Sequence, residues 1–220
     1  MPELSTVHHP LYQLRRTPFH ARTSQLCLPH NWRRWGGCLA VGSYDLGLDR
    51  EYWAIRNHAA LIDISPLIKY EITGRDAARL LHRLTPRDIH RMQAGQVYCT
   101  GWCDDDRKLL DDGTVTRIGE QSFRLTAAEP QYRWLAMNAV GMQVQVTELT
   151  EQMAALSLQG PKSRTILNAA CEQPVDSLKY FRMAPNRIHG KPVSISRTGY
   201  TGDLGYEIWM EAADALAIWD

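Results

Sequence analysis

The chain has 220 residues, of which 44% are hydrophobic and 22% are charged, close to the composition of globular proteins. This composition excludes a mainly disordered chain, and the length allows one large domain or two small ones. The net charge of +1, from 25 basic and 24 acidic residues, gives no electrostatic reason to expect nucleic acid or an anionic membrane as a partner. No apolar run approaches the roughly 20 residues of a membrane-spanning helix.

The cysteines and the N-terminus indicate the cellular compartment. Five cysteines, at positions 27, 38, 99, 103 and 171, are odd in number and lack the spacing of a disulfide framework. The segment from Met1 to Leu14 lacks the apolar core of a secretory signal. We therefore expect reduced thiols in a cytoplasmic protein.

The first part of the chain predicts an irregular start followed by alternating helices and strands. Residues 1–47 are rich in Arg, His and Trp and favour only strand or loop. Residues 49–60 favour a helix, and residues 61–73 favour a strand that breaks at Pro66. Residues 75–84 predict a short helix with its leucines on one face.

The remainder predicts strands that are paired by hairpins and connected by helices. A hairpin is expected between residues 114–118 and 122–127, across a connection that contains glycine. The order of elements after residue 129 favours an α+β fold of the ferredoxin-like kind. The other predicted elements are strands at residues 96–103, 142–149, 154–158, 193–196 and 206–210, and helices at 131–140, 162–170 and 211–220.

An acidic pair follows two leucines at residues 109–113 (LLDDG). Since side chains alternate along a strand, Asp111 and Asp112 should lie on opposite sides, one of them facing a cavity. A carboxylate in such a place could move protons during catalysis. The alternative is a solvated turn or an Asx cap.

A glycine-rich segment at residues 197–208 (RTGYTGDLGYEI) brings backbone close to a ligand or to a neighbouring strand. Glu207 lies in the strand that follows and offers two acceptor oxygens side by side. It would match a ligand with two N–H donors, such as a pterin edge, or an arginine. The alternative is a β-bulge turn with a structural ion pair.

Two other patterns point to structure more than to chemistry. Residues 158–161 (LQGP) form a junction in which the proline starts a helix. The candidates for a metal site are Cys99 with Cys103, Cys27 with His30, and the pair His8–His9, but no second ligand pair follows at the spacing of zinc sites. We therefore expect no metal.

Several segments, read in order from about residue 45 onwards, together form a recognisable series. They are residues 51–56 (EYWAIR) with 61–65 (LIDIS), 72–77 (ITGRDA), 95–112, 158–161 (LQGP) and 199–208 (GYTGDLGYEI). The series resembles the glycine-cleavage T-protein family, the folate-dependent aminomethyltransferases and their demethylase relatives.

This resemblance implies a fold with a discontinuous domain. A ferredoxin-like folate-binding domain would comprise residues 1–60 and 141–220, with a smaller α+β lobe, residues 61–140, inserted between them. A C-terminal barrel would follow but is absent here, so we expect this chain to be an N-terminal portion. The segment 211–220, which starts a helix without a stop signal, agrees with that expectation.

The resemblance also implies the site. Tetrahydrofolate would be the cofactor, with Asp111 as the catalytic residue near the folate amine that accepts the one-carbon unit. The cofactor contacts would be Tyr200, Glu207, Tyr98 and Asp112.

The sequence also departs from the family pattern. Arg107 and Lys108 replace turn glycines, Asp104 replaces an asparagine, and Ala127 replaces the asparagine of a V-N-A motif. These changes weaken the case for a lipoyl carrier protein as the source of the one-carbon unit.

The first functional hypothesis is a tetrahydrofolate-dependent aminomethyltransferase whose one-carbon donor is a small molecule or is held on a carrier. The alternatives are a folate-dependent demethylase of a small methylated compound and a non-catalytic folate-binding protein. Intact Asp111 and Asp112 favour an enzyme. No nucleic acid or membrane partner is expected.

Overall fold

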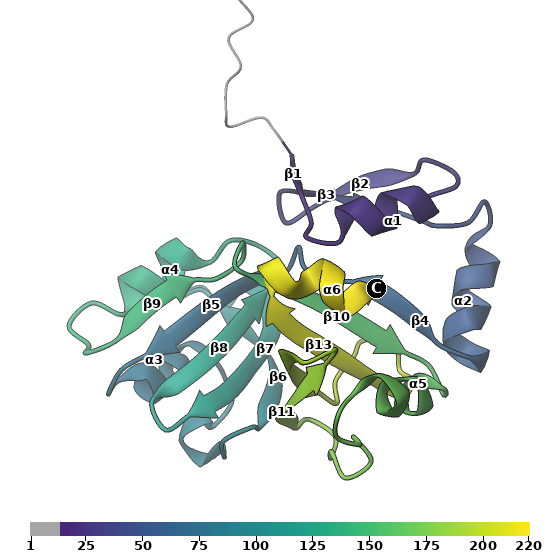
Figure 1. The fold of residues 1–220 in the computed structure, drawn as a ribbon. Coiled ribbons are helices and arrows are strands. Elements are labelled where there is room, and N and C mark those ends of the chain that lie inside the picture. Colours follow the sequence, from purple (N-terminus) through teal and green to yellow (C-terminus); the bar gives the residue numbers. More distant parts are fainter. Residues whose placement is uncertain (1–13) are drawn as a thin grey trace, which may run out of the picture.

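The computed structural model describes residues 14–220 and has three β-sheets flanked by short helices (Figure 1). The predicted α+β class is confirmed. In chain order the elements are β1 (Arg15–Arg16), α1 (His20–Leu26), β2 (Trp32–Trp35), β3 (Cys38–Val41), α2 (Leu48–Asn57), β4 (Ala60–Asp63), β5 (Ile68–Thr73), α3 (Ala77–Leu84), η2 (Ile89–Arg91), β6 (Val97–Cys103), β7 (Leu109–Gly119), β8 (Ser122–Ala127), α4 (Tyr132–Asn138), β9 (Gln145–Glu148), β10 (Met153–Gln159), α5 (Ser163–Ala170), β11 (Met183–Ile188), β12 (Lys191–Ser196), β13 (Gly205–Glu211), η3 (Ala212–Asp214) and α6 (Ala215–Trp219).

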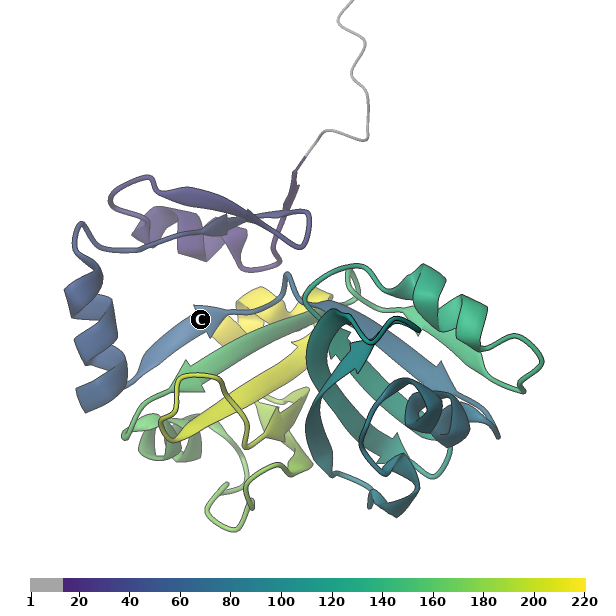
Figure 2. The ribbon, with the colours of Figure 1, turned by 180° about the vertical axis from the view of Figure 1, so that it is seen from behind.

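Two five-stranded sheets lie side by side and form the body of the molecule (Figures 1 and 2). Sheet I has the strand order β6-β7-β8-β5-β9, and sheet II has the order β11-β12-β13-β10-β4. Every neighbouring pair in both sheets is antiparallel. A third sheet, of order β1-β3-β2, belongs to the N-terminal segment.

The chain crosses between the two large sheets twice. It leaves sheet II after β4 and enters sheet I at β5, then returns between β9 and β10. Sheet II is therefore discontinuous in sequence. The sheets change between Asp63 and Ile68 and again between Glu148 and Met153.

Both sheets bury one face through regular alternation. In sheet I, Tyr70, Ile72, Phe123 and Leu125 pack with the leucines of α3 in one apolar cluster. In sheet II, a second cluster joins alternate residues of β10, β12 and β13 to α5 and α6. The opposite faces of the two sheets carry polar residues as well, and part of the space between them is a cavity described below.

The two sheets are joined at two seams. At the first seam the chain itself connects them, and the strand pairing of each sheet continues into the crossings: in sheet II Ile64 N donates to Ala155 O (3.0 Å), and in sheet I Leu149 N donates to Lys69 O (2.8 Å). Elsewhere, Met183 N donates to Gly95 O (2.7 Å). At the same place Val97 N donates to Phe181 O (3.0 Å), and Phe181 adopts a positive φ of 54°.

The N-terminal sheet and α1 lie over the part of the body that carries α6 (Figures 1 and 2). The Phe19 ring lies 5.7 Å from that of Trp219, and Arg22 binds both carboxylate oxygens of Asp220. Close packing also occurs at Gly36, where a Cβ would lie 2.1 Å from Pro66 O.

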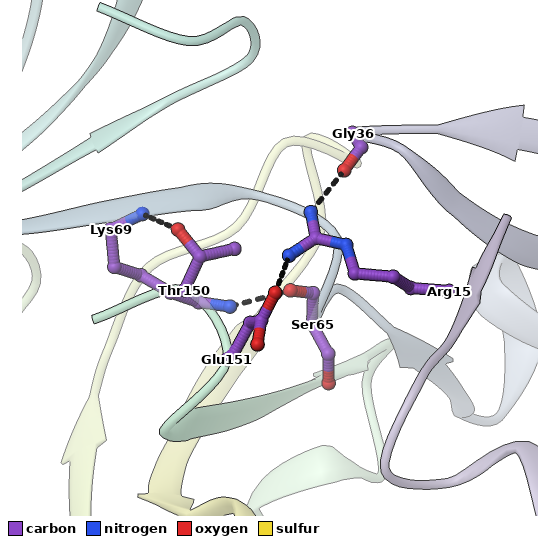
Figure 3. A network of polar contacts seen from close by, with 6 residues as sticks. All are labelled: Arg15, Gly36, Ser65, Lys69, Thr150 and Glu151. Atoms are coloured by element: carbon purple, nitrogen blue, oxygen red, sulfur yellow. Dashed lines mark hydrogen bonds and ion pairs between the residues drawn. The ribbon is translucent and has the colours of Figure 1, made fainter. Parts of the chain in front are cut away.

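A small polar network joins this segment to the crossings (Figure 3). Arg15 pairs with Glu151 and donates to Gly36 O. Beside it Lys69, with a fully buried side chain, donates from Nζ to Ser65 O (2.5 Å) and from its backbone N to Thr150 Oγ1 (3.2 Å). Lys69 makes no ion pair within the described residues.

Candidate functional site

A cavity of about 220 Å³ lies between sheet I and sheet II. Sheet I contributes residues from β6, β7 and β8, and sheet II contributes β13 and the glycine-rich turn before it. The lining residues are Leu67, Cys99, Asp112, Gly113, Thr114, Thr126, Ala127, Ala128, Phe181, Thr198, Gly199, Tyr200, Glu207 and Trp209. The structure thus brings together Tyr200, Glu207 and Asp112, three of the five residues predicted from sequence.

Glu207 is held in the cavity wall by hydroxyl groups. It lies on β13 opposite Ser196 of β12, and its Oε2 accepts from Thr198 Oγ1 at 2.8 Å and from Ser196 Oγ at 3.4 Å. Burial raises the pKa of Glu207, although these hydrogen bonds and the charge of Arg124 act in the opposite direction. Among the described residues Oε1 has no hydrogen-bond donor, so it is available to a ligand.

The glycine-rich turn wraps around the amide of Gln159, which is fully buried. Gln159 Nε2 donates to Thr198 O (3.2 Å), and its Oε1 accepts from Thr201 Oγ1 (2.9 Å). A Cβ at Gly199 or Gly205 would lie about 2 Å from Gln159 Oε1, which explains both glycines. Residues 158–161 therefore do have the structural role expected from sequence: they hold the turn that presents Tyr200, which is 67% exposed, at the cavity.

The two adjacent carboxylates have the reverse of the expected orientation. They do lie on opposite faces of β7, but Asp112 lines the cavity while Asp111 shares the face of Val115, which belongs to the buried apolar cluster of sheet I. Asp111 is 8% exposed. Its Oδ1 accepts from Asp112 N (2.8 Å), and its Oδ2 accepts from Glu129 N (2.9 Å). Asp111 therefore points away from the cavity and fixes the chain before α4.

Tyr98 also lies on the face of sheet I that is turned away from the cavity. It is opposite Val115 in the β6–β7 register, and its ring packs against the same apolar cluster and under the guanidinium of Arg87 (5.6 Å). The neighbouring Cys99 lines the cavity instead. A contact between Tyr98 and a ligand in this cavity does not fit the geometry.

The cavity is also lined by residues that were not predicted from sequence. Thr114 and Thr126 are register partners on β7 and β8, and Trp209 lies two residues after Glu207 on β13. The guanidinium of Arg124 lies 5.1 Å from the centre of the Trp209 ring, and burial lowers the pKa of Arg124 to about 10. The predicted hairpin was a sufficient signal for the threonines, since pairing 114–118 with 122–127 places them side by side.

A cation site has no support in the described part of the chain. No three His, Cys, Asp or Glu side chains of residues 14–220 are grouped so that they could hold a metal ion. Cys99 and Cys103 are exposed, and Cys27 is buried. The pair His8–His9 and most of the segment Met1–Leu14 lie outside the described residues. Within residues 14–220, no helix has the length and apolar character needed to cross a membrane.

Residues 22–220 match the family model described as the GCVT N-terminal domain. The chain is 37% identical over 200 residues to the heme-dependent oxidative N-demethylase gamma subunit of Ectopseudomonas mendocina, covering 90% of this chain and 53% of that protein. It is 34% identical over 220 residues to trimethylamine-oxide aldolase of Ruegeria pomeroyi, covering 94% of this chain and 27% of that protein. The chain thus spans about half, or less, of the length of these curated relatives.

A solved structure has the same fold. The glycine cleavage system aminomethyltransferase T from Bartonella henselae superposes with a TM-score of 0.83 at 26% identity, covering 94% of this chain and 56% of that one. Together with the family match, this likeness agrees with the series of motifs found in the sequence. The chain belongs to the glycine-cleavage T-protein family, within the part of it that the GCVT N-terminal domain defines.

Proposed function

We propose that this chain binds tetrahydrofolate in the cavity between the two sheets and serves an enzyme that transfers a one-carbon unit to it. The observation that carries the proposal is the open carboxylate oxygen of Glu207 in a cavity that also holds Asp112 and Tyr200. The localisation we propose is the cytoplasm. We also propose that the discontinuous domain has a ferredoxin-like topology and that a C-terminal barrel follows it.

The residues present fit the pterin ring of such a cofactor. A pterin edge carries adjacent N–H donors, and a carboxylate accepts two parallel hydrogen bonds. Hydroxyl groups hold Glu207 Oε2 and leave Oε1 free, so Oε1 can accept an N–H of the ring. The phenol ring of Tyr200 offers a surface on which an aromatic part of the ligand can pack.

The cavity volume supports a ring rather than a whole folate molecule. Its volume of about 220 Å³ is below the roughly 300–1,000 Å³ of typical sites for drug-sized ligands. A second cavity of about 300 Å³ shares Thr198 and Gly199 with it and is also lined by Tyr180 and Arg197. The tail of the ligand would continue in that direction.

The residues of this chain would then divide the work. When bound, tetrahydrofolate supplies the secondary amine that accepts the one-carbon unit. Asp112 would orient this amine and hold the proton that it gives up, a role typically worth about 100-fold to 10,000-fold in rate. Asp111 would position Asp112, since its carboxylate binds the backbone N–H of Asp112.

The source of the one-carbon unit separates two candidate functions. The first is an aminomethyltransferase of the kind named by the Bartonella structure, with a donor on a lipoyl carrier protein or another carrier. The second is a demethylase component acting with a small methylated amine. The identity to relatives named for N-demethylation and for trimethylamine oxide is 37% and 34%, slightly above the 30% and 32% to two curated aminomethyltransferases, and this difference favours the second. A non-catalytic folate-binding role would leave Asp112 without a function.

Calorimetric titration of the chain with tetrahydrofolate tests the binding. The Glu207→Gln variant should bind about 10-fold to 100-fold more weakly, because one charge-assisted hydrogen bond is worth about 1.5–3 kcal/mol. Glu211→Gln, which changes an exposed carboxylate on the same strand, is the matched control and should bind like the wild type. Absence of folate binding by the wild type would overturn the proposal, and equal binding by Glu207→Gln would remove Glu207 from the site.

A further inference from the structure

Two threonine hydroxyls form a pair on the sheet I side of the cavity. Thr114 and Thr126 face each other across β7 and β8, and both line the cavity. Their Oγ1 atoms are 2.6 Å apart, which is a hydrogen-bond distance. The backbone N of Thr114 also donates to Thr126 Oγ1, at 3.1 Å.

The Thr114–Thr126 pair has one hydroxyl hydrogen that is not used within the pair. Each threonine hydroxyl carries one hydrogen, and the link between the two oxygens uses one of them. Whichever oxygen donates within the pair, the hydrogen of the other hydroxyl remains. Neither hydroxyl donates to any further acceptor among the described residues.

The position of this spare hydrogen makes it significant. Thr126 is 4% exposed and Thr114 is partly buried, and a polar hydrogen that is shielded from water and has no acceptor costs free energy. The carboxylates of the cavity, Asp112 and Glu207, are acceptors, yet neither is hydrogen-bonded to the pair. The wall therefore offers a neutral donor alongside anionic acceptors.

We propose that the Thr114–Thr126 pair donates a hydrogen bond to the ring carbonyl oxygen of the bound ligand and so selects a ring with a carbonyl next to its N–H edge. The inference deepens the proposed function and rests on it. A 4-oxo pterin has this pattern: N–H groups for Glu207 and an adjacent carbonyl for the pair. In the 4-amino analogue that oxygen is replaced by an amino group, which leaves the spare hydroxyl hydrogen without its acceptor.

Binding of two ligands to the wild type and to variants of Thr114 and Thr126 tests this role of the pair. The ligands are the tetrahydro forms of folate and of its 4-amino analogue, and the readout is the dissociation constant from calorimetry. Thr114→Val/Thr126→Val removes both hydroxyls at nearly constant shape. It should weaken binding of the 4-oxo ligand about 10-fold and leave the 4-amino ligand nearly unchanged, as expected for the loss of one neutral hydrogen bond.

Conservative and single variants make the result specific. Thr114→Ser/Thr126→Ser keeps both hydroxyls. It should therefore keep the wild-type ratio of the two dissociation constants, defined as the value for the 4-amino ligand divided by the value for the 4-oxo ligand. Each single valine variant keeps one spare hydrogen, so the double variant should lose more than the two single variants together. Thermal melts report whether each variant folds, and Thr114→Ala/Thr126→Val replaces the double valine variant if that one does not.

The possible outcomes separate this inference from the proposed function. A ratio of dissociation constants that is the same in the wild type and in the double variant overturns the role of the pair, even if both ligands bind tightly. Failure of the wild type to bind either ligand overturns the proposed function, and the inference with it. A drop in the ratio confined to the variants without hydroxyls supports the inference.

Discussion

The carboxylates of Asp111 and Asp112 lie on opposite faces of β7, and a hydrogen bond of 2.8 Å from the backbone N of Asp112 to Asp111 Oδ1 links the two residues. Asp111 Oδ2 binds Glu129 N on its other side. Both oxygens of Asp111 therefore accept hydrogen bonds from the backbone, while Asp112 faces the cavity. Asp111 is thus placed to stabilise the fold, and Asp112 is placed to contact a ligand.

Replacing each aspartate by asparagine should separate a role in catalysis from a role in stability. In Asp112→Asn the side chain keeps its shape but cannot take up a proton, so one-carbon transfer should fall about 100-fold or more while tetrahydrofolate affinity changes only a few-fold. The melting temperature should stay near that of the wild type. Steady-state rates and calorimetry on the protein that carries this chain measure both effects.

Asp111→Asn should instead reduce stability. Two backbone N–H groups bind the two different oxygens of Asp111, and an asparagine has only one oxygen, so one N–H would face an amide NH₂. A buried donor without an acceptor costs about 1–3 kcal/mol, which urea unfolding would detect. If Asp111→Asn is fully stable and Asp112→Asn fully active, both positions have been assigned to the wrong role.

The buried amine of Lys69 predicts a pH-dependent stability. Burial lowers the pKa of Lys69 from 10.5 to about 8, so the charged form is less stable in the folded state than in the unfolded state. Below pH 8 this penalty is fully present. As the pH rises from 8 towards 10.5 the folded amine loses its proton first, and the protein gains stability.

The comparison of wild type with Lys69→Met isolates this effect. The free energy of unfolding of the wild type, relative to the variant, should rise by about 2 kcal/mol between pH 7 and pH 9.5. Lys108→Met, at an exposed position, is the control and should follow the pH dependence of the wild type. Parallel curves for wild type and Lys69→Met would mean that Lys69 is solvated in solution.

The close contact of Gly36 with Pro66 predicts that this glycine is required where the N-terminal sheet packs on the body. Gly36 has φ +53°, and a Cβ there would lie 2.1 Å from Pro66 O, so Gly36→Ala adds backbone strain and a steric clash. The expected loss is about 2 kcal/mol or more in unfolding experiments, with faster proteolysis of the N-terminal segment. Gly47→Ala is the control: no atom lies within 4 Å of its Cβ position, and its φ is −123°. An equal effect of the two changes would contradict the docking role of Gly36.

Local pattern was sufficient for much of the secondary structure. The helix predicted at 162–170 is α5, and the predicted hairpin 114–118 with 122–127 is the turn between β7 and β8. Pro66 breaks the predicted strand 61–73 into β4 and β5, as expected, and the break turned out to be a change of sheet. These features are determined by residues that are close together in sequence, so they could be predicted from the local sequence pattern.

Features that depend on distant partners could not be read in the same way. Alternation shows that Asp111 and Asp112 face opposite ways, but the choice of face is made by Val115 and by Trp102 across the strand pair. Strand β11 contains Pro185 and Asn186 and was missed, because an edge strand tolerates such residues and its pairing with β12 supplies the stability. Strands β1 to β3 fit the expectation of strand or loop before residue 47, whereas helix α1 in the same segment was not predicted.

The two seams between the sheets have a consequence for binding kinetics. One seam combines both chain crossings, and the other joins Gly95 and Val97 to Phe181 and Met183, so the walls are tied together in two places. Because chain crossings on one side and backbone hydrogen bonds on the other hold the two walls together, we expect binding to require no closing motion of the sheets and to cost little conformational entropy. Association should then be a single bimolecular encounter, whose observed rate rises in proportion to ligand concentration and reaches no plateau.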